Sequence, residues 1–516
     1  MAKNHKSFNY ELMLIILILV FGFFLRVYAL GYSPFWIDEA TSTMASRMIA
    51  QKGAPVFDSG LVYSRAYIFH YIQAFFLLFG MTDFNARFIS VIFGMLTIVL
   101  AYFIGREYSK AGGILSALFT AVFYLEVFFS RQARFYQLFQ LMFFLSIYLL
   151  YKSGEVKNKN KNESRKYESK NRKYESKKSE TIYLVLSIIA FFIALDTQIA
   201  ALVLAPFLII HILFYNTKYN KYFAIIPLIP LISKFMPAVS LSSFSSGSSV
   251  SSGFSEPLEV VTNYADQYFS FTQNLRYLLI FFIPGVLVSG FKKWKLTILM
   301  ILPSVIMLVG IFSLPTFALR YAYFMIFPII IYSSVLIGFL YNKLGKVVIL
   351  LILFLLVFPS NLIYPYTYVN IIKPINYNHG YSDYSSPETD YKSVPENIAI
   401  KLRDKDNTLV SLFSSDVEWY IRKPDYVIPF SMNGIGEDQI SFNKTINGVR
   451  TAEMVDSYSG ALILTSKTEL KKLYYVTADT FSVSKLKSGQ KQRLDKLVEG
   501  CEAVYSADDL NIYECA

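Results

Sequence analysis

Two adjacent carboxylates, Asp38 and Glu39, follow the first apolar segment of the chain, within the stretch Ser33–Thr41. A proline and two aromatic residues in this stretch mark the exit from a bilayer, because Trp prefers the headgroup zone. A carboxylate at that depth can act as a general base toward a lipid-borne substrate. Asp38 can instead cap a surface helix that runs from about residue 39 to residue 51. This stretch alone does not separate the two roles.

Further charged residues gather where the predicted spans reach the same membrane face. Charges near a bilayer core are costly and are therefore functional candidates, although a single arginine at the interface can simply snorkel. Arginine stays charged and binds phosphate through paired hydrogen bonds. Arginines that converge on carboxylates thus suit a phosphate-bearing lipid headgroup beside a base. The predicted outer cluster contains Asp38, Glu39, Arg65, Glu126, Arg131, Arg134, Asp196 and Arg320.

The composition is typical of a polytopic α-helical membrane protein. The 516 residues are 54% hydrophobic and only 17% charged, and long apolar runs recur. Much of the net charge of +12 lies in predicted cytoplasmic loops, so it indicates topology and not a nucleic-acid partner. The two cysteines and four histidines lack the spacing of a metal site, which argues against structural zinc.

The distribution of Lys and Arg predicts about eleven transmembrane helices and a cytoplasmic N-terminus. The apolar run 67–79 is short for a span, and letting it cross would place the basic loop 152–180 outside. We therefore expect this run on the outer surface, as a juxtamembrane helix beside the Asp38 helix. The spans are expected at 10–30, 88–104, 113–129, 135–151, 181–195, 199–214, 222–235, 275–288, 296–312, 321–340 and 347–362.

The chain divides by composition into two domains. Residues 1–364 form the predicted transmembrane domain, with a first outer loop at 31–86, a basic cytoplasmic loop at 152–180 and a Ser-rich outer loop at 237–274. The Ser-rich loop is either a slack connector or a lid over the site. Residues 365–516 are polar and carry short β-like runs, which predicts a small extracytoplasmic α/β domain. Cys501 and Cys515 flank a predicted hairpin there, as a disulfide or as two buried thiols.

The order of these motifs resembles that of the C-type glycosyltransferases related to protein O-mannosyltransferases and the bacterial lipid A aminoarabinose transferase. The resemblance covers about residues 30–328 and is strongest over 36–151. Asp38-Glu39 resembles the acidic motif of the family, and the late pair Arg320-Tyr321 resembles its Arg-Tyr pair. Two further segments carry the resemblance, Arg87–Gly94 at the start of the second span and Ser130–Tyr136 before the fourth.

Two positions depart from the family pattern. Gln132 stands where many members have Glu. Ser64-Arg65-Ala66 stands where members usually have His or Lys followed by two prolines. Arg65 could supply the missing cation, and the departure bears on which substrate is handled.

The resemblance implies a mannosyltransferase-like enzyme that moves a sugar from a dolichyl or undecaprenyl phosphate to an acceptor hydroxyl at the outer face, with inversion. Asp38 would be the general base, while Glu39 would orient the acceptor or share a metal. No cofactor is required if arginines neutralise the leaving phosphate, and a divalent metal stays open. The acceptor is a lipid, a glycan or a protein. The residues expected to bind the donor phosphate are Arg65, Arg134 and Arg320. The residues expected to support them are Tyr136, Tyr321, Arg131 and Asp196.

Two other functions compete with the transferase. A transporter or flippase of lipid-linked sugars should show internal repeats and broken helices near the bilayer midplane, whereas the charges here lie at one rim. A membrane sensor with an outer ligand-binding domain does not explain the rim arginines. The sequence favours the transferase and leaves the sugar and the acceptor undetermined.

Overall fold

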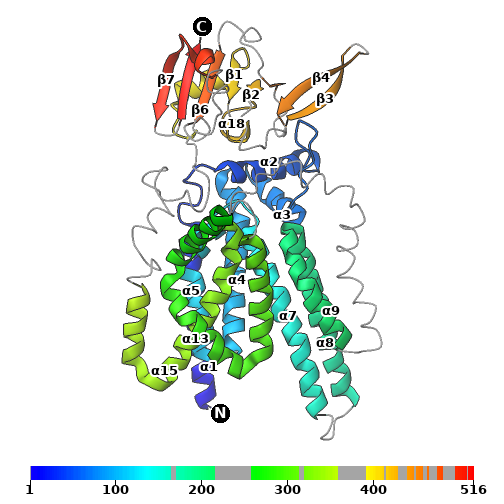
Figure 1. Ribbon diagram of the computed structural model, residues 1–516, viewed down its shortest axis with the longest axis vertical. Coiled ribbons are helices and arrows are strands. Elements are labelled where there is room, and N and C mark those ends of the chain that lie inside the picture. The colour runs from blue at the N-terminus through cyan, green and yellow to red at the C-terminus, as the bar shows by residue number, and fades with distance from the viewer. Residues whose placement is uncertain are drawn as a thin grey trace.

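The computed structural model describes residues 2–163, 170–214, 257–312, 319–357, 391–411, 414–427, 439–446, 449–456, 462–463, 474–479, 494–507 and 510–515. These residues form a helical bundle and a separate C-terminal sheet domain (Figure 1). The N-terminus lies at the end of the bundle that is remote from the sheet. The predicted class, a helical membrane protein with a small C-terminal α/β domain, is confirmed.

Twelve α-helices in the described residues build the bundle and its outer end. Two of them, α2 and α3, lie across the end of the bundle that faces the sheet domain (Figure 1). The eleven residues of α3 reach only about 16 Å, well short of a bilayer core of about 30 Å. The helices of the bundle are α1 (Ala2–Val27), α2 (Ile37–Lys52), α3 (Tyr67–Leu77), α4 (Asp83–Arg106), α5 (Lys110–Val122), α6 (Tyr124–Ser130), α7 (Tyr136–Glu163), α8 (Lys170–Thr197), α9 (Ala205–Phe214), α13 (Pro257–Phe312), α14 (Leu319–Ala322) and α15 (Ile326–Val357), with 3₁₀ turns η1 (Ile199–Leu204) and η3 (Tyr323–Met325).

Within the described ranges, five helical segments are long and apolar enough to cross a membrane, or six if α5 and α6 count as one bent span. The expected span 113–129 is wrong as a continuous helix, because Phe123 adopts an extended conformation and the chain bends by 59° there. The expected span 222–235 lies outside the described residues.

Two long helices contain breaks where the sequence predicts inner loops. Non-helical backbone at Lys293 divides α13 between the spans expected at 275–288 and 296–312. A left-handed Gly345 (φ 75°) divides α15 between the spans expected at 321–340 and 347–362, a conformation that glycine adopts without strain. The number of spans depends on whether each broken helix crosses once or twice, so eleven spans stay a prediction.

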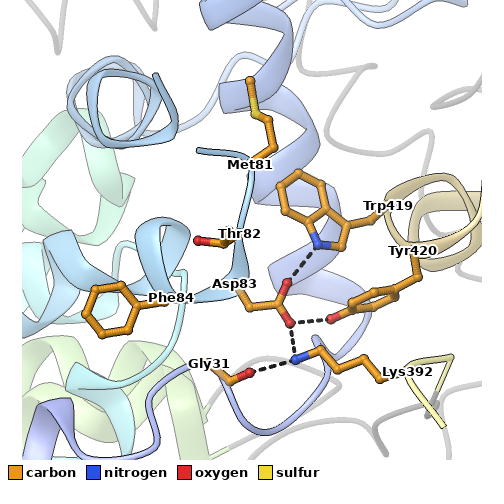
Figure 2. Close-up of a pocket in the computed structure, with 8 residues that line it drawn as sticks. All are labelled: Gly31, Met81, Thr82, Asp83, Phe84, Lys392, Trp419 and Tyr420. Carbon is orange, nitrogen blue, oxygen red and sulfur yellow. Dashed lines mark hydrogen bonds and ion pairs between the residues drawn. The ribbon is translucent and has the colours of Figure 1, made fainter. Parts of the chain in front are cut away.

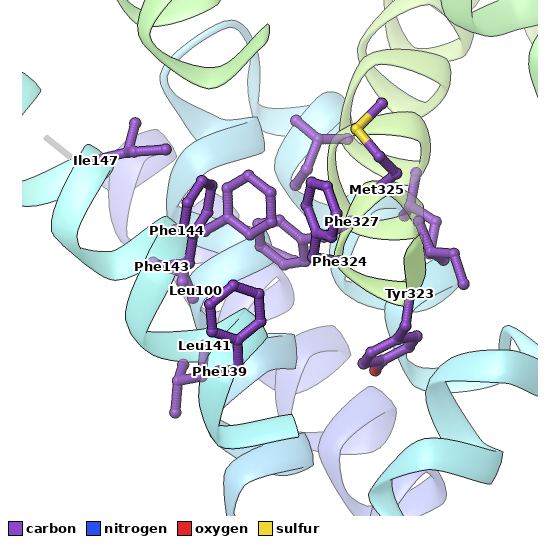
Figure 3. Close-up of a cluster of buried hydrophobic side chains, with 14 of the residues drawn as sticks. Leu100, Phe139, Leu141, Phe143, Phe144, Ile147, Tyr323, Phe324, Met325 and Phe327 are labelled. Atoms are coloured by element: carbon purple, nitrogen blue, oxygen red, sulfur yellow. The ribbon is translucent and has the colours of Figure 1, made fainter. Parts of the chain in front are cut away.

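Aromatic side chains of α7 pack against η3 and α15 at the centre of the bundle (Figure 3). The rings of Phe144 and Phe327 stack with centroids 4.8 Å apart, and Phe143 meets Phe324 at 6.0 Å. Close side-chain packing of this kind holds helices together inside a membrane, where lipid provides no hydrophobic drive between them. The contact fixes η3 and therefore the preceding helix α14, which carries Arg320.

The outer domain contains a mixed eight-stranded sheet in the order β3-β4-β5-β2-β1-β6-β8-β7. Strand β1 pairs in parallel with β2 and β6, and the two edges of the sheet are antiparallel. Cys501 and Cys515 form a disulfide, which decides between the two alternatives that the sequence left open. The elements are α17 (Glu396–Arg403), β1 (Thr408–Ser411), α18 (Ser414–Tyr420), β2 (Tyr426–Val427), β3 (Gln439–Ile446), β4 (Val449–Asp456), β5 (Leu462–Ile463), β6 (Tyr474–Asp479), β7 (Glu502–Ala507) and β8 (Leu510–Cys515).

Candidate functional site

Asp38 and Glu39 lie side by side in the first turn of α2 but in different environments. The helix begins at Ile37 with Trp36 as its N-cap, so the capping role considered for Asp38 is wrong. The Asp38 side chain is one-third exposed, and its Oδ2 lies 3.5 Å from Nη2 of Arg134. Glu39 is buried, with 1% of its surface exposed. Only Asp38 is therefore open to a substrate.

Glu39 is fully occupied by protein partners. Arg87 of α4 donates from Nε to Oε1 at 2.9 Å and from Nη2 to Oε2 at 2.8 Å. The backbone N–H of Ala133 donates to Oε1 at 2.6 Å. Such a two-pronged pair between buried groups is directional and rigid. Glu39 thus joins α2 to α4 and to the segment before α7. Its contacts hold the first turn of α2, which also carries Asp38.

Arg134, in the segment before α7, also binds α2. Its Nη1 donates to the backbone carbonyl of Asp38 at 3.0 Å and to the Ser42 hydroxyl. The hydroxyls of Tyr63 and Tyr136 lie 3.5 Å from its two terminal nitrogens. The side chain is buried, so this charge is held next to Asp38 with little screening by solvent.

Arg320, far along the chain, reaches the same place. Its guanidinium lies 5.3 Å from the centre of the Trp36 ring, and that of Arg134 lies 6.0 Å from it. Tyr321 packs on Arg320 at 5.2 Å. Two guanidinium groups of like charge thus share one indole next to Asp38. The sequence-based grouping of Asp38, Arg134, Arg320, Tyr136 and Tyr321 corresponds to one place in the structure.

Polar atoms without a hydrogen-bond partner concentrate in this region. In the described part of the chain, Nε of Arg134, Nε of Arg320 and Nε1 of Trp36 are buried and lack a partner. Nearly all buried N–H groups in proteins are bonded, so each exception calls for an explanation. All three are donors, and two carry positive charge. The arrangement can bind an anion.

A buried histidine extends the site behind Arg134, and the sequence analysis missed it. Nδ1 of His70 lies 2.9 Å from the Ser46 hydroxyl, which itself donates to Oε1 of Gln73 at 2.5 Å. The ring must then donate from Nδ1, and its Nε2 is buried without a partner. Burial, together with the nearby Arg134 charge, lowers the pKa of His70 to about 3. His70 is neutral at physiological pH, and its rarity as one of four histidines was the available signal.

Three predicted site residues have other roles or positions. Arg131 donates to the backbone carbonyls of Arg26 (3.0 Å) and Tyr28 (2.8 Å), closing the end of α1. Asp196 accepts the first backbone N–H groups of α3, including that of Ile68 at 2.9 Å. Arg65 is exposed just before α3, and the described residues show no contact that joins it to the other two arginines.

Glu126, another member of the predicted outer cluster, lies deeper in the bundle. It accepts from Nε2 of Gln140 at 2.9 Å and from the Tyr323 hydroxyl at 2.7 Å. It therefore belongs to a buried polar network and not to the Asp38 site. Nowhere in the described ranges do three or more His, Cys, Asp or Glu residues come together as a metal site.

One family of known proteins matches part of the chain by sequence. The family described as dolichyl-phosphate-mannose-protein mannosyltransferase matches residues 65–163, the stretch that contains Arg65, Arg87, Arg131, Arg134 and Tyr136. No curated protein matches the chain by sequence. The matched segment is less than a fifth of the chain. The rest of the chain is compared through its structure.

Several solved structures share the fold. ArnT from Cupriavidus metallidurans matches in the apo state with a TM-score of 0.56 at 11% identity, over 99% of this chain and 98% of that one. Its complex with undecaprenyl phosphate matches with a TM-score of 0.54 at 12% identity, over 98% of each chain. At such identities a match establishes the fold and leaves the activity open.

Archaeal oligosaccharyltransferases are similar to a lesser extent. The Archaeoglobus fulgidus enzyme tethered to an acceptor peptide with the NVT sequon matches with a TM-score of 0.52 at 12% identity, over 91% of this chain and 69% of that chain. AglB from the same organism, in complex with an inhibitory peptide and a dolichol-phosphate, has a TM-score of 0.49 at 12% identity, over 81% of this chain. The chain spans 64% of that protein's length.

Proposed function

We propose that this chain, a member of the C-type glycosyltransferase superfamily, transfers a sugar from a polyprenyl-phosphate donor to an acceptor hydroxyl. The single observation that carries the proposal is the ion pair of partly exposed Asp38 with Arg134, which shares the Trp36 ring with Arg320. A carboxylate base and a cationic phosphate site are the two parts that such a transfer needs. The sheet domain lies next to α2, the helix that carries Asp38 (Figure 1).

The donor phosphate binds to Arg134 and Arg320 in this proposal. Their Nε–H groups and the Trp36 Nε1–H are buried donors without protein partners, which suits the oxygens of a phosphate. The fold of ArnT, one of whose structures contains undecaprenyl phosphate, favours a polyprenyl carrier. The description of the matching family favours dolichyl-phosphate mannose as one donor to test.

Asp38 accepts the proton of the acceptor hydroxyl as that oxygen attacks the anomeric carbon. The new bond joins the acceptor oxygen to the sugar, and the bond between the anomeric carbon and the phosphate oxygen breaks. Attack opposite the leaving group inverts the anomeric centre. The phosphate departs with one more negative charge, which the two arginines stabilise where it develops.

Glu39 positions Asp38 and does not react, because both of its oxygens are bonded to Arg87. Arg65 is exposed and stays a candidate for contact with the donor or acceptor as they enter. Tyr136 and Tyr321 pack against Arg134 and Arg320 and limit their movement.

Product analysis tests the function directly. Purified protein in detergent is mixed with undecaprenyl- or dolichyl-phosphate sugars and with lipid, glycan and peptide acceptors, and products are identified by mass spectrometry. We expect a mass gain of one sugar on one acceptor class together with release of free polyprenyl phosphate. Stoichiometric movement of intact donor across liposomes without sugar transfer would instead support a flippase.

A further inference from the structure

The outer domain contacts the transmembrane domain through a buried carboxylate, Asp83, at the start of α4 (Figure 2). Nε1 of Trp419 donates to Oδ1 at 2.8 Å, and the Tyr420 hydroxyl donates to Oδ2 at 2.9 Å. Lys392 forms an ion pair with the same carboxylate. We name Lys392, Trp419 and Tyr420 the outer clamp. Its three polar groups surround a side chain that is only 7% exposed.

The outer clamp also binds the loop that leads to Asp38. The backbone N–H of Phe35 donates to the Tyr420 hydroxyl at 2.7 Å. Nζ of Lys392 donates to the carbonyl of Gly31 at 2.8 Å and lies 3.2 Å from that of Ser33. The Phe35 ring packs against Trp419 with centroids 5.4 Å apart. A domain more than 350 residues away in sequence thus supplies hydrogen-bond partners to this loop.

Arg87 holds the same loop from the membrane side. It donates to the carbonyls of Ser33 at 2.8 Å and Pro34 at 2.9 Å, in addition to its pair with Glu39. Asp83 and Arg87 are four residues apart on α4 and so lie on one face of the helix. One helical turn therefore carries both anchors, Asp83 for the outer domain and Arg87 for the α2 end of the loop.

We infer that Tyr420 and Lys392 are positioning residues for Asp38, which lies three residues after Phe35. The inference rests on the proposed function for Asp38. The loop before α2 has no strand or helix of its own, so side chains from two domains must fix it. A base misplaced by about 1 Å can lose on the order of a hundredfold in rate. The outer domain thereby forms part of the catalytic unit.

The hydroxyl of Tyr420 has a specific role in this arrangement, because it accepts from Phe35 and donates to Asp83 at once. The Phe35 residue is fully buried, and a buried backbone N–H that loses its acceptor is costly. A pocket of about 370 Å³ borders the outer clamp and is lined by Met81, Phe84 and the clamp residues (Figure 2).

Tyr420→Phe tests the inference, with Tyr474→Phe as the matched control. Tyr474 donates to the carbonyl of Leu497 within the outer domain, so the control also removes one buried tyrosine hydroxyl bond. In Tyr420→Phe we expect amide hydrogen exchange over residues 31–40 to rise about tenfold, the equivalent of one lost hydrogen bond. Turnover should fall by a similar factor, while affinity for undecaprenyl phosphate stays at the wild-type value. The control should change neither exchange over 31–40 nor turnover.

Lys392 provides a second arm. Lys392→Ala should raise exchange over residues 31–40 and lower turnover, and Lys392→Arg should restore much of both. Wild-type exchange in Tyr420→Phe and Lys392→Ala would overturn the inference, as would faster exchange with undiminished turnover. If the wild-type protein transfers no sugar, the proposed function fails, and the exchange measurements still decide whether the outer domain orders the loop.

Discussion

Arg87 binds both carboxylate oxygens of Glu39, at 2.9 and 2.8 Å, while the neighbouring Asp38 keeps a third of its side chain exposed. The adjacent acids thus have separate tasks. Glu39 fixes the first turn of α2 against α4, and Asp38 presents a carboxylate next to Arg134. This division could not be read from the pair Asp-Glu, in which either residue could be the base.

Glu39→Gln should lower stability before it affects chemistry. The variant leaves the buried Arg87 guanidinium without its counter-charge, and breaking one partner of a buried pair costs on the order of 3–5 kcal/mol. Thermal unfolding in detergent measures the loss. Asp58→Asn serves as the control, because the Lys52–Asp58 pair is exposed and should change stability by less than about 1 kcal/mol. A Glu39→Gln protein of wild-type stability and no turnover would instead make Glu39 catalytic.

Arg134→Ala and Arg320→Ala should weaken binding of undecaprenyl phosphate, because each removes a charged donor to a partly desolvated phosphate. The loss of a charged hydrogen bond is about 1.5–3 kcal/mol, which corresponds to roughly 10- to 150-fold in affinity. Lysine should rescue incompletely because it lacks the planar fork. Native mass spectrometry or a fluorescent lipid-phosphate assay measures the affinity.

Arg65→Ala separates the predicted three-arginine site from the two-arginine site. Arg65 is exposed, so we expect a smaller change in affinity than for either buried arginine. Equal losses for all three variants would restore Arg65 to the phosphate site. Wild-type affinity in both Arg134→Ala and Arg320→Ala would refute the phosphate site altogether.

His70 should make the protein sensitive to mild acid. Its folded-state pKa of about 3 lies below the ordinary value of 6.5, so the unfolded chain gains a proton that the folded chain refuses. Stability is therefore lost as pH falls below 6.5, by up to about 2 kcal/mol at pH 5. His70→Asn can still donate to Ser46 but does not titrate. Melting temperatures at pH 7 and pH 5 should converge in this variant, whereas equal pH slopes in both proteins would exclude His70 as the cause.

The orientation in the membrane is a prediction from the basic loops. A cysteine at Ser176, in the basic segment, should react with an impermeant maleimide only after the cytoplasmic side is opened. A cysteine at the exposed Asn397 of the outer domain should react in intact cells. The reverse pattern would place Asp38 on the cytoplasmic face and would contradict the outer-face site.

Local sequence signals predicted much of the fold. The apolar run at 67–79 was predicted to be a juxtamembrane helix from its short length and from the position of the basic loops, and α3 forms within it. The Lys-rich turn at 292–295 marked the break in α13 at Lys293. The β-like runs at 408–413, 426–430, 461–465, 503–505 and 511–515 predicted β1, β2, β5, β7 and β8. They missed β3, β4 and β6. The many polar residues of β3 and β4 read as loop, whereas β6 begins with two tyrosines and a valine, which are typical of a strand.

Long-range packing limited the prediction of the site. The predicted topology placed Arg134 and Arg320 at one membrane face. No local sequence pattern shows that both guanidinium groups contact the Trp36 ring. Arg131 and Asp196 have the same residue types as true site members and instead close the ends of α1 and α3. Backbone groups at helix ends need partners, and a charged residue beside such an end satisfies them. Sequence spacing does not distinguish that use from substrate binding.

The role of Asp38 as base is the central claim, and Asp38→Asn tests it most directly. Trp36 and not Asp38 occupies the N-cap, so the variant should fold and keep α2. The measurement is the rate of sugar transfer beside the affinity for undecaprenyl phosphate, at matched folded protein. We predict a fall in rate on the order of 10²–10⁴-fold, because an amide cannot accept the proton, with donor affinity retained. A well-folded Asp38→Asn protein that transfers sugar at the wild-type rate would contradict the account.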